Sequence, residues 1–249
     1  MNLITEYDLY YLFDPRFFSL LSISYVLNTI NAVKITNCCN IIPEVSKNFV
    51  RFYNVVQIVV CSYMTVGLFP VVSAGLSNPF GINMPYNDLT EWYLFIHYLS
   101  KYLDWVDTAI IISRRKTKQL SLLHVYHHSS VSMIWGFMLY MGHGNGTATF
   151  GAWINSLTHV IMYGHYLLTS FNIRNPFKRY ITMWQITQFY LCVIHACTLL
   201  FIYPEWETYL PISYSWLQLT YHTTLITLFT SYMDYVPKIL TIYPNPKTF

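Results

Sequence analysis

The chain has 249 residues, of which 54% are hydrophobic, 18% are aromatic and only 10% are charged. Soluble globular proteins carry about 25% charged residues, so this composition argues against a soluble domain and indicates a membrane protein. The net charge of +3 is small, and we expect no nucleic-acid partner from it.

Seven apolar stretches are each long enough to cross a hydrocarbon layer of about 30 Å, which takes about 20 helical residues. We therefore expect an all-α, polytopic membrane protein whose seven transmembrane helices form a single domain over residues 1–249. The first stretch is the weakest, because Asn28 and Asn31 interrupt it. In chain order, the predicted helices lie near residues 17–33, 51–76, 91–112, 119–142, 147–171, 180–203 and 212–235.

Neither the first residues nor the cysteines suggest processing or cross-linking. The opening MNLITEYDLYYLFDP has acids where a cleavable signal peptide has a basic region, so we expect it in the mature protein. The cysteines lack the spacing of disulfide pairs or metal ligands, and we expect buried thiols. They are Cys38, Cys39, Cys61, Cys192 and Cys197.

Basic residues alternate between the predicted loops. They follow the first, third, fifth and last spans, whereas the opposite side has only Arg16 and Lys101 lies inside the third span. Because an excess of Lys and Arg marks cytoplasmic loops, we expect a lumenal N-terminus and a cytosolic C-terminus. The cytoplasmic set is Lys34, Lys47, Arg51, Arg114, Arg115, Lys116, Lys118, Arg174, Lys178, Arg179, Lys238 and Lys247.

The stretch 121-SLLHVYHHSS-130 places His124, His127 and His128 in the first half of the fourth span. Positions i, i+3 and i+4 share one face of a helix, so the three rings are expected to point the same way. Polar clusters at membrane depth are costly and usually face a bundle interior or a cavity, which makes this a candidate functional site. Hydrogen bonding between helices is the alternative, although one histidine would suffice for it.

The third span carries 101-KYLDWVDT-108, which puts Lys101, Asp104 and Thr108 on one helical face with Asp107 at its edge. A self-neutralising pair of Lys101 and Asp104 that only orders the bundle is the alternative interpretation. In either case the charges are predicted to face the interior, because lipid-facing charges are rare.

Two further spans direct polar groups to the same depth. The fifth contains 155-NSLTHVIMYGHY-166, and the sixth contains 182-TMWQITQF-189. Helical spacing aligns one set of these side chains toward the cytoplasmic half of the bundle. The set is Asn155, His159, Met162, Tyr166, Gln185, Gln188 and Phe189, with Tyr163 and His165 beside it.

These four segments, HVYHH, KYLDWVDT, NSLTHVIMYGHY and TMWQITQF, resemble in order the boxes of the ELO family of very-long-chain fatty acid elongases. The boxes span residues 101–189, and the seven-span layout extends the likeness over one ELO-type transmembrane domain, residues 1–249. The chain departs from the family pattern at Asp104, where Glu is usual, and at His165, where Tyr is usual.

The resemblance implies a helical bundle that encloses a substrate tunnel open to the cytosol. It also implies condensation of malonyl-CoA with a long-chain fatty acyl-CoA, which gives a 3-oxoacyl-CoA two carbons longer, CO2 and CoA. Tyr126, between the box histidines, slightly favours polyunsaturated chains. No cofactor or metal is implied beyond the two CoA substrates. The catalytic candidates are His124, His127, His128 and His159.

We expect His127 to attack the acyl thioester and His159 or His128 to stabilise the enolate, because covalent catalysis divides one difficult step into two. A direct ternary mechanism in which histidines act only as bases stays open. Carboxylates orient catalytic histidines, and amide donors stabilise oxyanions. The supporting candidates are Lys101, Asp104, Asp107, Asn155, Tyr163, Gln185 and Gln188.

Loop charges and family likeness together predict the partners and the location. A basic rim of Arg114, Arg115, Lys116, Lys118, Arg174, Lys178 and Arg179 is expected to bind the phosphates of CoA. Tyr203, Trp206 and Trp216 are candidates for limiting acyl length at the lumenal ends of the last two spans. We expect a multi-pass protein of the endoplasmic reticulum membrane, with other enzymes of the elongation cycle as candidate partners. The oligomeric state cannot be predicted.

Two other functions remain open at this point. A histidine box could hold the di-iron centre of a membrane desaturase or hydroxylase, because imidazole binds iron, but such a centre needs more histidine boxes than this one. A seven-helix receptor or photoreceptor with a Schiff base on Lys101 is the non-enzymatic alternative, and it leaves the histidine box unexplained.

Overall fold

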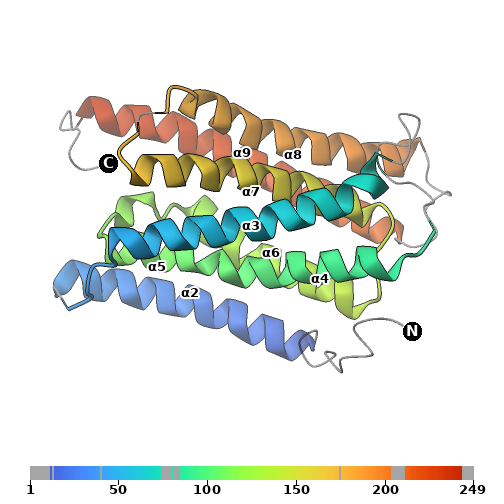
Figure 1. Ribbon diagram of the computed structural model, residues 1–249, viewed down its shortest axis with the longest axis horizontal. Coiled ribbons are helices and arrows are strands. Elements are labelled where there is room, and N and C mark those ends of the chain that lie inside the picture. The colour runs from blue at the N-terminus through green and yellow to red at the C-terminus, as the bar shows by residue number, and fades with distance from the viewer. Residues whose placement is uncertain are drawn as a thin grey trace.

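A computed structural model describes residues 12, 14–39, 41–73, 80, 85–173, 175–202 and 211–242. All regular structure in these ranges is helical (Figure 1). In chain order, the helices are α2 (Pro15–Cys38), α3 (Lys47–Val72), α4 (Asp88–Leu103), α5 (Trp105–Ser113), the 3-10 turn η2 (Thr117–Gln119), α6 (Leu122–Tyr140), α7 (Ala148–Ser170), α8 (Lys178–Phe201) and α9 (Ile212–Ile242).

The prediction of an all-α protein is confirmed, and each predicted stretch contains helix. Among the described residues, three helices, α2, α3 and α8, are long and apolar enough to cross a membrane by length and composition. The predicted third helix differs, because it is divided into α4 and α5 by a break at Asp104. With 16 and 9 residues, neither part reaches the roughly 20 residues of a complete span.

Local sequence determines where several helices begin. Ser46 accepts a hydrogen bond from the backbone of Phe49, Asn87 from that of Leu89, and Ser121 from that of His124. These side chains satisfy amide groups that lack partners in the first helical turn. The cap at Ser121 therefore sets the start of α6 directly before the histidines.

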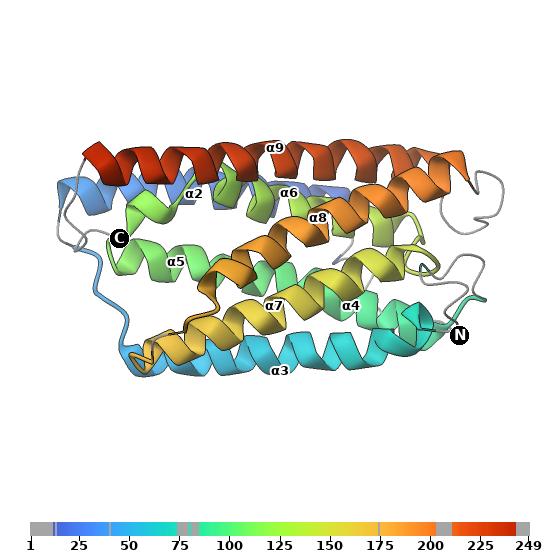
Figure 2. The ribbon, with the colours of Figure 1, turned by 90° about the horizontal axis from the view of Figure 1, so that it is seen from above.

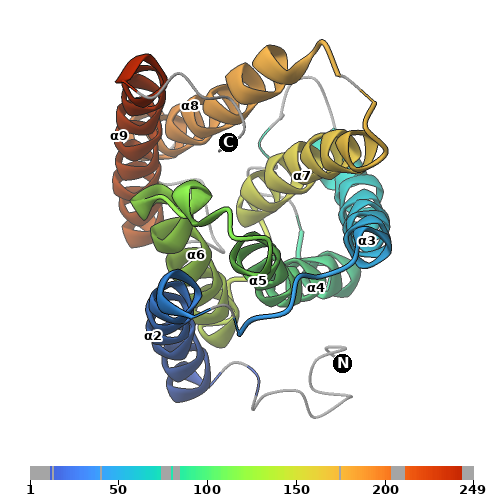
Figure 3. The ribbon, with the colours of Figure 1, turned by 90° about the vertical axis from the view of Figure 1, so that its left-hand side faces the viewer.

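Six segments form a closed ring. Around it, α3 packs against α4, α4 against α6, α6 against α9, α9 against α8, α8 against α7, and α7 against α3. Figure 3 shows this ring end-on, with α2 outside it against α6 and α5. Seen from above in Figure 2, α8 runs obliquely from the end of α7 toward α9. Residues of α3 and of α5 to α9 together line a cavity.

The outside of the bundle is apolar. Leu20 on α2 and Val59 and Val66 on α3 are 67%, 62% and 72% exposed, which is costly in water but favourable against lipid. The two cysteines at the end of α2, Cys38 and Cys39, are also exposed. The expectation of buried thiols is wrong for this pair, because α2 ends there outside the ring.

One end of the bundle gathers the basic residues. There the hydroxyl of Ser113 accepts from the amide of Val45 and donates to the carbonyl of Pro43, at 2.7 and 2.9 Å. Arg114 lies 3.7 Å from Glu44. These contacts fasten the α2–α3 loop to the end of α5, so the loops predicted to be cytoplasmic meet at one end of the molecule.

Candidate active site

The histidines of α6 face the interior of the ring. The rings of His124 and His128 lie 4.2 Å apart, and those of His127 and His128 lie 5.7 Å apart. The Nε2 of His124 is 2.8 Å from the hydroxyl of Thr108, which is also 2.8 Å from the hydroxyl of Tyr25 on α2. A threonine of α5 therefore orients His124, where we expected a carboxylate to orient a ring.

Around His127, a chain of hydrogen bonds ends at a carbonyl group. The hydroxyl of Ser130 donates to the carbonyl of Tyr126 at 2.6 Å and lies 3.0 Å from the hydroxyl of Tyr221 on α9. The Tyr221 oxygen is in turn 3.4 Å from Nδ1 of His127. Because a carbonyl only accepts, Ser130 donates to it and Tyr221 can donate to Ser130. His127 then donates through Nδ1, which leaves a lone pair on Nε2.

The break between α4 and α5 creates a second polar cluster. The hydroxyl of Tyr53 on α3 donates to the carbonyl of Leu103 at 3.2 Å, which satisfies a backbone group next to the break, as a membrane interior requires. Lys101 lies 3.4 Å from the Asp104 carboxylate and donates to the Asn155 side chain at 2.8 Å. The Lys101–Asp104 ion pair that the alternative interpretation expected is therefore present. The same lysine also hydrogen-bonds Asn155 of the fifth predicted span.

The carboxylates of Asp104 and Asp107 both contact side chains of α7. The Asp104 carboxylate is 3.7 Å from Nδ1 of His159, and Asp107 accepts a hydrogen bond of 2.5 Å from the hydroxyl of Tyr163. Neither Nδ1 of His159 nor that of His128 has a hydrogen-bond partner among the described residues. Both are buried nitrogens, and that of His159 faces the Asp104 carboxylate.

Three residues of α3 that sequence reasoning missed complete this cluster. Gln57 donates to the Asp104 carboxylate at 2.9 Å and lies 2.8 and 3.1 Å from the hydroxyls of Tyr53 and Tyr163. Asn54, beside Tyr53, is 2% exposed. The signal was in the stretch 53-YNVVQ-57, where three polar side chains interrupt an apolar span.

A cavity of about 650 Å³ opens between these groups; we call it the polar cavity. Lys101 and Asp104 lie directly behind its wall, in contact with the wall residues Asn155, His159 and Tyr163. The predicted site residues that line it are His124, His127, His128, His159, Asp107, Asn155, Tyr163, Gln185 and Gln188. The structure therefore brings the predicted catalytic and supporting residues together.

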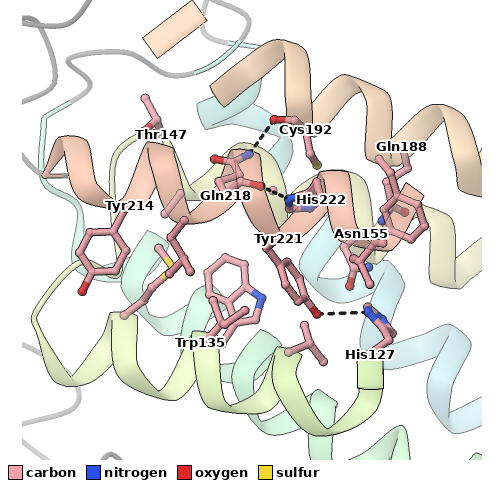
Figure 4. Close-up of a pocket in the computed structure, with 18 residues that line it drawn as sticks. His127, Trp135, Thr147, Asn155, Gln188, Cys192, Tyr214, Gln218, Tyr221 and His222 are labelled. Carbon is pink, nitrogen blue, oxygen red and sulfur yellow. Dashed lines mark hydrogen bonds between the residues drawn. The ribbon is translucent and has the colours of Figure 1, made fainter. Parts of the chain in front are cut away.

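A second, smaller cavity of about 90 Å³ continues from the first between α6, α7, α8 and α9; we call it the apolar cavity. His127, Asn155, Gln188 and Phe189 line both cavities. Figure 4 shows His127, Asn155 and Gln188 close together at one end, with Trp135 and Tyr214 further along. The Oε1 of Gln188 has no partner in the part of the chain that the structure describes, so the junction carries an amide oxygen ready to accept a hydrogen bond.

The far wall of the apolar cavity differs from our expectation. The α9 residues that line the apolar cavity along its length are Tyr214, Gln218, Tyr221 and His222. Trp216, by contrast, is 49% exposed and packs against Phe201. Trp216 was a wrong prediction as a residue that limits acyl length, because it lies on the helical face opposite the cavity. Tyr203 and Trp206, the other two candidates, lie outside the described residues.

Only part of the predicted basic rim reaches the polar cavity. Arg114, Lys116 and Lys178 line it, whereas Arg179 and His165 line an adjoining surface groove beside Asn175, which shares Thr169 and Lys178 with the polar cavity. Arg115, with a positive φ of 57°, lines neither cavity. Arg174 and the side chain of Lys118 lie outside the described residues. Within the residues that the structure describes, no three His, Cys, Asp or Glu side chains are grouped to hold a metal ion.

Comparison with known proteins finds related sequences over most of the chain. The sequence profile of the ELO, GNS1/SUR4 family matches residues 10–236. Fatty acid elongase 5 of Trypanosoma cruzi (strain CL Brener) is 44% identical over 180 residues, which cover 72% of this chain and 68% of that protein. Fatty acid elongase 4 of Trypanosoma brucei brucei (strain 927/4 GUTat10.1) is 43% identical over 180 residues, 72% of this chain and 69% of that protein. Very long chain fatty acid elongase 5 of Bos taurus is 37% identical over 146 residues, 56% and 46% respectively.

Proposed function

The chain belongs to the GNS1/SUR4 family and is a membrane enzyme of fatty acid elongation, and we propose that it condenses malonyl-CoA with a long-chain fatty acyl-CoA through a histidine nucleophile. The observation that carries this proposal is the meeting of the polar and apolar cavities at His127. An acyl chain in the apolar cavity would place its thioester at this histidine, with the CoA arm in the polar cavity.

In the first step, Nε2 of His127 attacks the thioester carbonyl. The carbon–sulfur bond breaks, CoA leaves as a thiolate that takes up the proton given up by the imidazole at Nδ1, and a neutral acyl-imidazole forms. The hydrogen-bond chain from Nδ1 through Tyr221 and Ser130 to the Tyr126 carbonyl supports this role, because it leaves the Nε2 lone pair free. Asn155 and Gln188, at the same junction, are placed to bind the thioester through their amide groups.

In the second step, malonyl-CoA loses CO2 and the electrons of the broken carbon–carbon bond form an enolate. His159 or His128, which both line the polar cavity, stabilises the enolate oxygen through a ring N–H group. The enolate carbon attacks the acyl-imidazole, the carbon–nitrogen bond breaks, and His127 is regenerated. Asp104, 3.7 Å from Nδ1 of His159, orients that ring.

The proposal also includes the way the chain crosses the membrane. The basic residues gather at one end of the bundle, where Arg114, Lys116 and Lys178 line the mouth of the polar cavity. The positive-inside rule then supports seven crossings in a single domain, with a lumenal N-terminus, a cytosolic C-terminus and CoA entering from the cytosol. For such an enzyme we propose the endoplasmic reticulum membrane as its location.

The named relatives are elongases, which favours this reaction over the metal-dependent oxidation and the receptor that the sequence left open. Expression in a cell that lacks its own elongases, fed saturated and polyunsaturated fatty acids of graded length, tests the function directly. Mass spectrometry is expected to detect products two carbons longer, absent from the empty-vector strain. If the protein is expressed normally and none of the supplied fatty acids is lengthened by two carbons, the proposed condensation is disproved.

A further inference from the structure

Asn54 on α3 is a buried polar residue that the proposed chemistry does not use. Its side chain is 2% exposed and lines the polar cavity. Among the described residues, its Nδ2 has no hydrogen-bond partner. A buried amide donor without a partner costs free energy unless a ligand or water satisfies it. The neighbouring Tyr53 and Gln57, by contrast, are both bonded to the groups around Asp104.

The depth of Asn54 in the cavity can be obtained from its neighbours. The hydroxyl oxygens of Tyr53 and of Tyr163 on α7 lie 3.3 Å apart. The helices α3 and α7 run in opposite directions (Figure 1). His159 precedes Tyr163 by four residues and therefore lies about 6 Å deeper, at about 1.5 Å per residue. Asn54 follows Tyr53, which is level with Tyr163, so Asn54 lies about one helical turn nearer the cavity mouth than His159. Arg114 and Lys178, which also line the cavity, belong to the basic end of the bundle.

We propose that Asn54 binds the pantetheine arm of the CoA substrates, at the amide two methylene groups from the sulfur. This inference rests on the proposed function, because the thioester is then held at His127 and His159. The arm continues from the sulfur toward the basic mouth and places its first amide at the level of Asn54. An amide both donates and accepts, so Asn54 can pair with it in either direction. Asn54 does not line the apolar cavity, which excludes a role in binding the acyl chain.

A cycle of protein and substrate changes tests this contact. The substrates are two acyl thioesters of the same fatty acid, one of N-acetylcysteamine, which keeps the amide, and one of 1-pentanethiol, which replaces it with methylene groups. Both lack phosphates, so the basic rim affects them equally. With saturating malonyl-CoA, the wild type is expected to use the amide thioester about tenfold better in kcat/KM. In Asn54→Leu the ratio is expected to fall to about one, and Asn54→Ala repeats the test with a smaller side chain.

Binding of CoA itself, measured by calorimetry on the full chain in detergent, provides a second readout. Asn54→Leu is expected to weaken it about tenfold, whereas Val59→Ala, on the exposed face of the same helix, leaves it unchanged. If Asn54→Leu leaves the thioester ratio or the CoA affinity unchanged while the wild type elongates fatty acids, the role of Asn54 is overturned and the proposed function stands. If the wild type failed to elongate but Asn54→Leu still weakened CoA binding, the proposed function would fall and the binding site would stand.

Discussion

Replacing His127 with alanine is expected to lower kcat by about four orders of magnitude, because no other group can then form the acyl-enzyme. His127 is the catalytic candidate of α6 that lines both cavities. Its removal is expected to leave the fold intact, since the one side-chain hydrogen bond that it makes to the described residues, with Tyr221, is long at 3.4 Å. Elongation rates and thermal unfolding of the purified variant in detergent measure the two effects separately.

The matched control for His127→Ala is His165→Tyr, which introduces the residue usual in the family. His165 faces a surface groove beside Asn175, 2.9 Å away, and does not line the polar cavity. We expect His165→Tyr to keep the activity of the wild type within about threefold, because the reacting groups lie elsewhere. A folded His127→Ala enzyme that retained more than about one hundredth of the wild-type kcat would contradict nucleophilic catalysis by this residue.

Breaking the buried ion pair of Lys101 and Asp104 is expected to have the largest effect on stability. Their side chains are 2% and 3% exposed, so removing one partner leaves the other charge buried without its ion-pair partner. Lys101→Met is expected to lower the free energy of unfolding by about 3–5 kcal/mol. It also removes the hydrogen bond to Asn155, so elongation activity is expected to fall as well.

The double variant Lys101→Met/Asp104→Leu is expected to be more stable than Lys101→Met, because no lone charge remains. Denaturation in detergent, followed for the wild type, both single variants and the double variant, gives the coupling free energy of the pair. Leu89→Ala, at a 51% exposed position near the start of the same helix, is the control for a general effect of substitution in α4. Additive losses in the double variant would show that the two charges do not compensate each other.

The alignment of the box histidines could be predicted from sequence because a single helix determines it. Residues i, i+3 and i+4 share a face in any regular α-helix, and α6 is regular from Leu122 to Tyr140. The same rule placed Asn155 and His159 on one face of α7. The basic loops allowed us to predict which end of these helices carries the site, because the preference for cytoplasmic Lys and Arg acts on each loop by itself.

The break at Asp104 could not be predicted in this way, because it depends on another helix. The stretch 101-KYLDWVDT-108 contains neither proline nor glycine, the usual local causes of a break. Instead the Tyr53 hydroxyl bonds the Leu103 carbonyl, and Gln57 bonds the Asp104 carboxylate. Both interactions require α3 to be in place beside α4, which periodicity within one span cannot reveal.

The cooperation of α6 with α9 was likewise beyond sequence reasoning. The Tyr221 hydroxyl lies 3.4 Å from Nδ1 of His127, yet 91 residues separate Tyr221 from its other partner, Ser130. Sequence reasoning treated α9 as a tunnel wall and singled out Trp216, which faces outward. A helix presents several faces, and which one meets the interior is decided by packing against α6 and α8.

The central claim is that an acyl group is carried on His127 where the two cavities meet. Incubating the wild-type enzyme with acyl-CoA alone, followed by rapid acid quenching, proteolysis and peptide mass spectrometry, tests it most directly. The claim predicts one acyl group on the peptide that contains His127, and its loss in step with product when malonyl-CoA is added. Full turnover without any adduct, or an adduct carried instead by Cys192 of the apolar cavity, would contradict it.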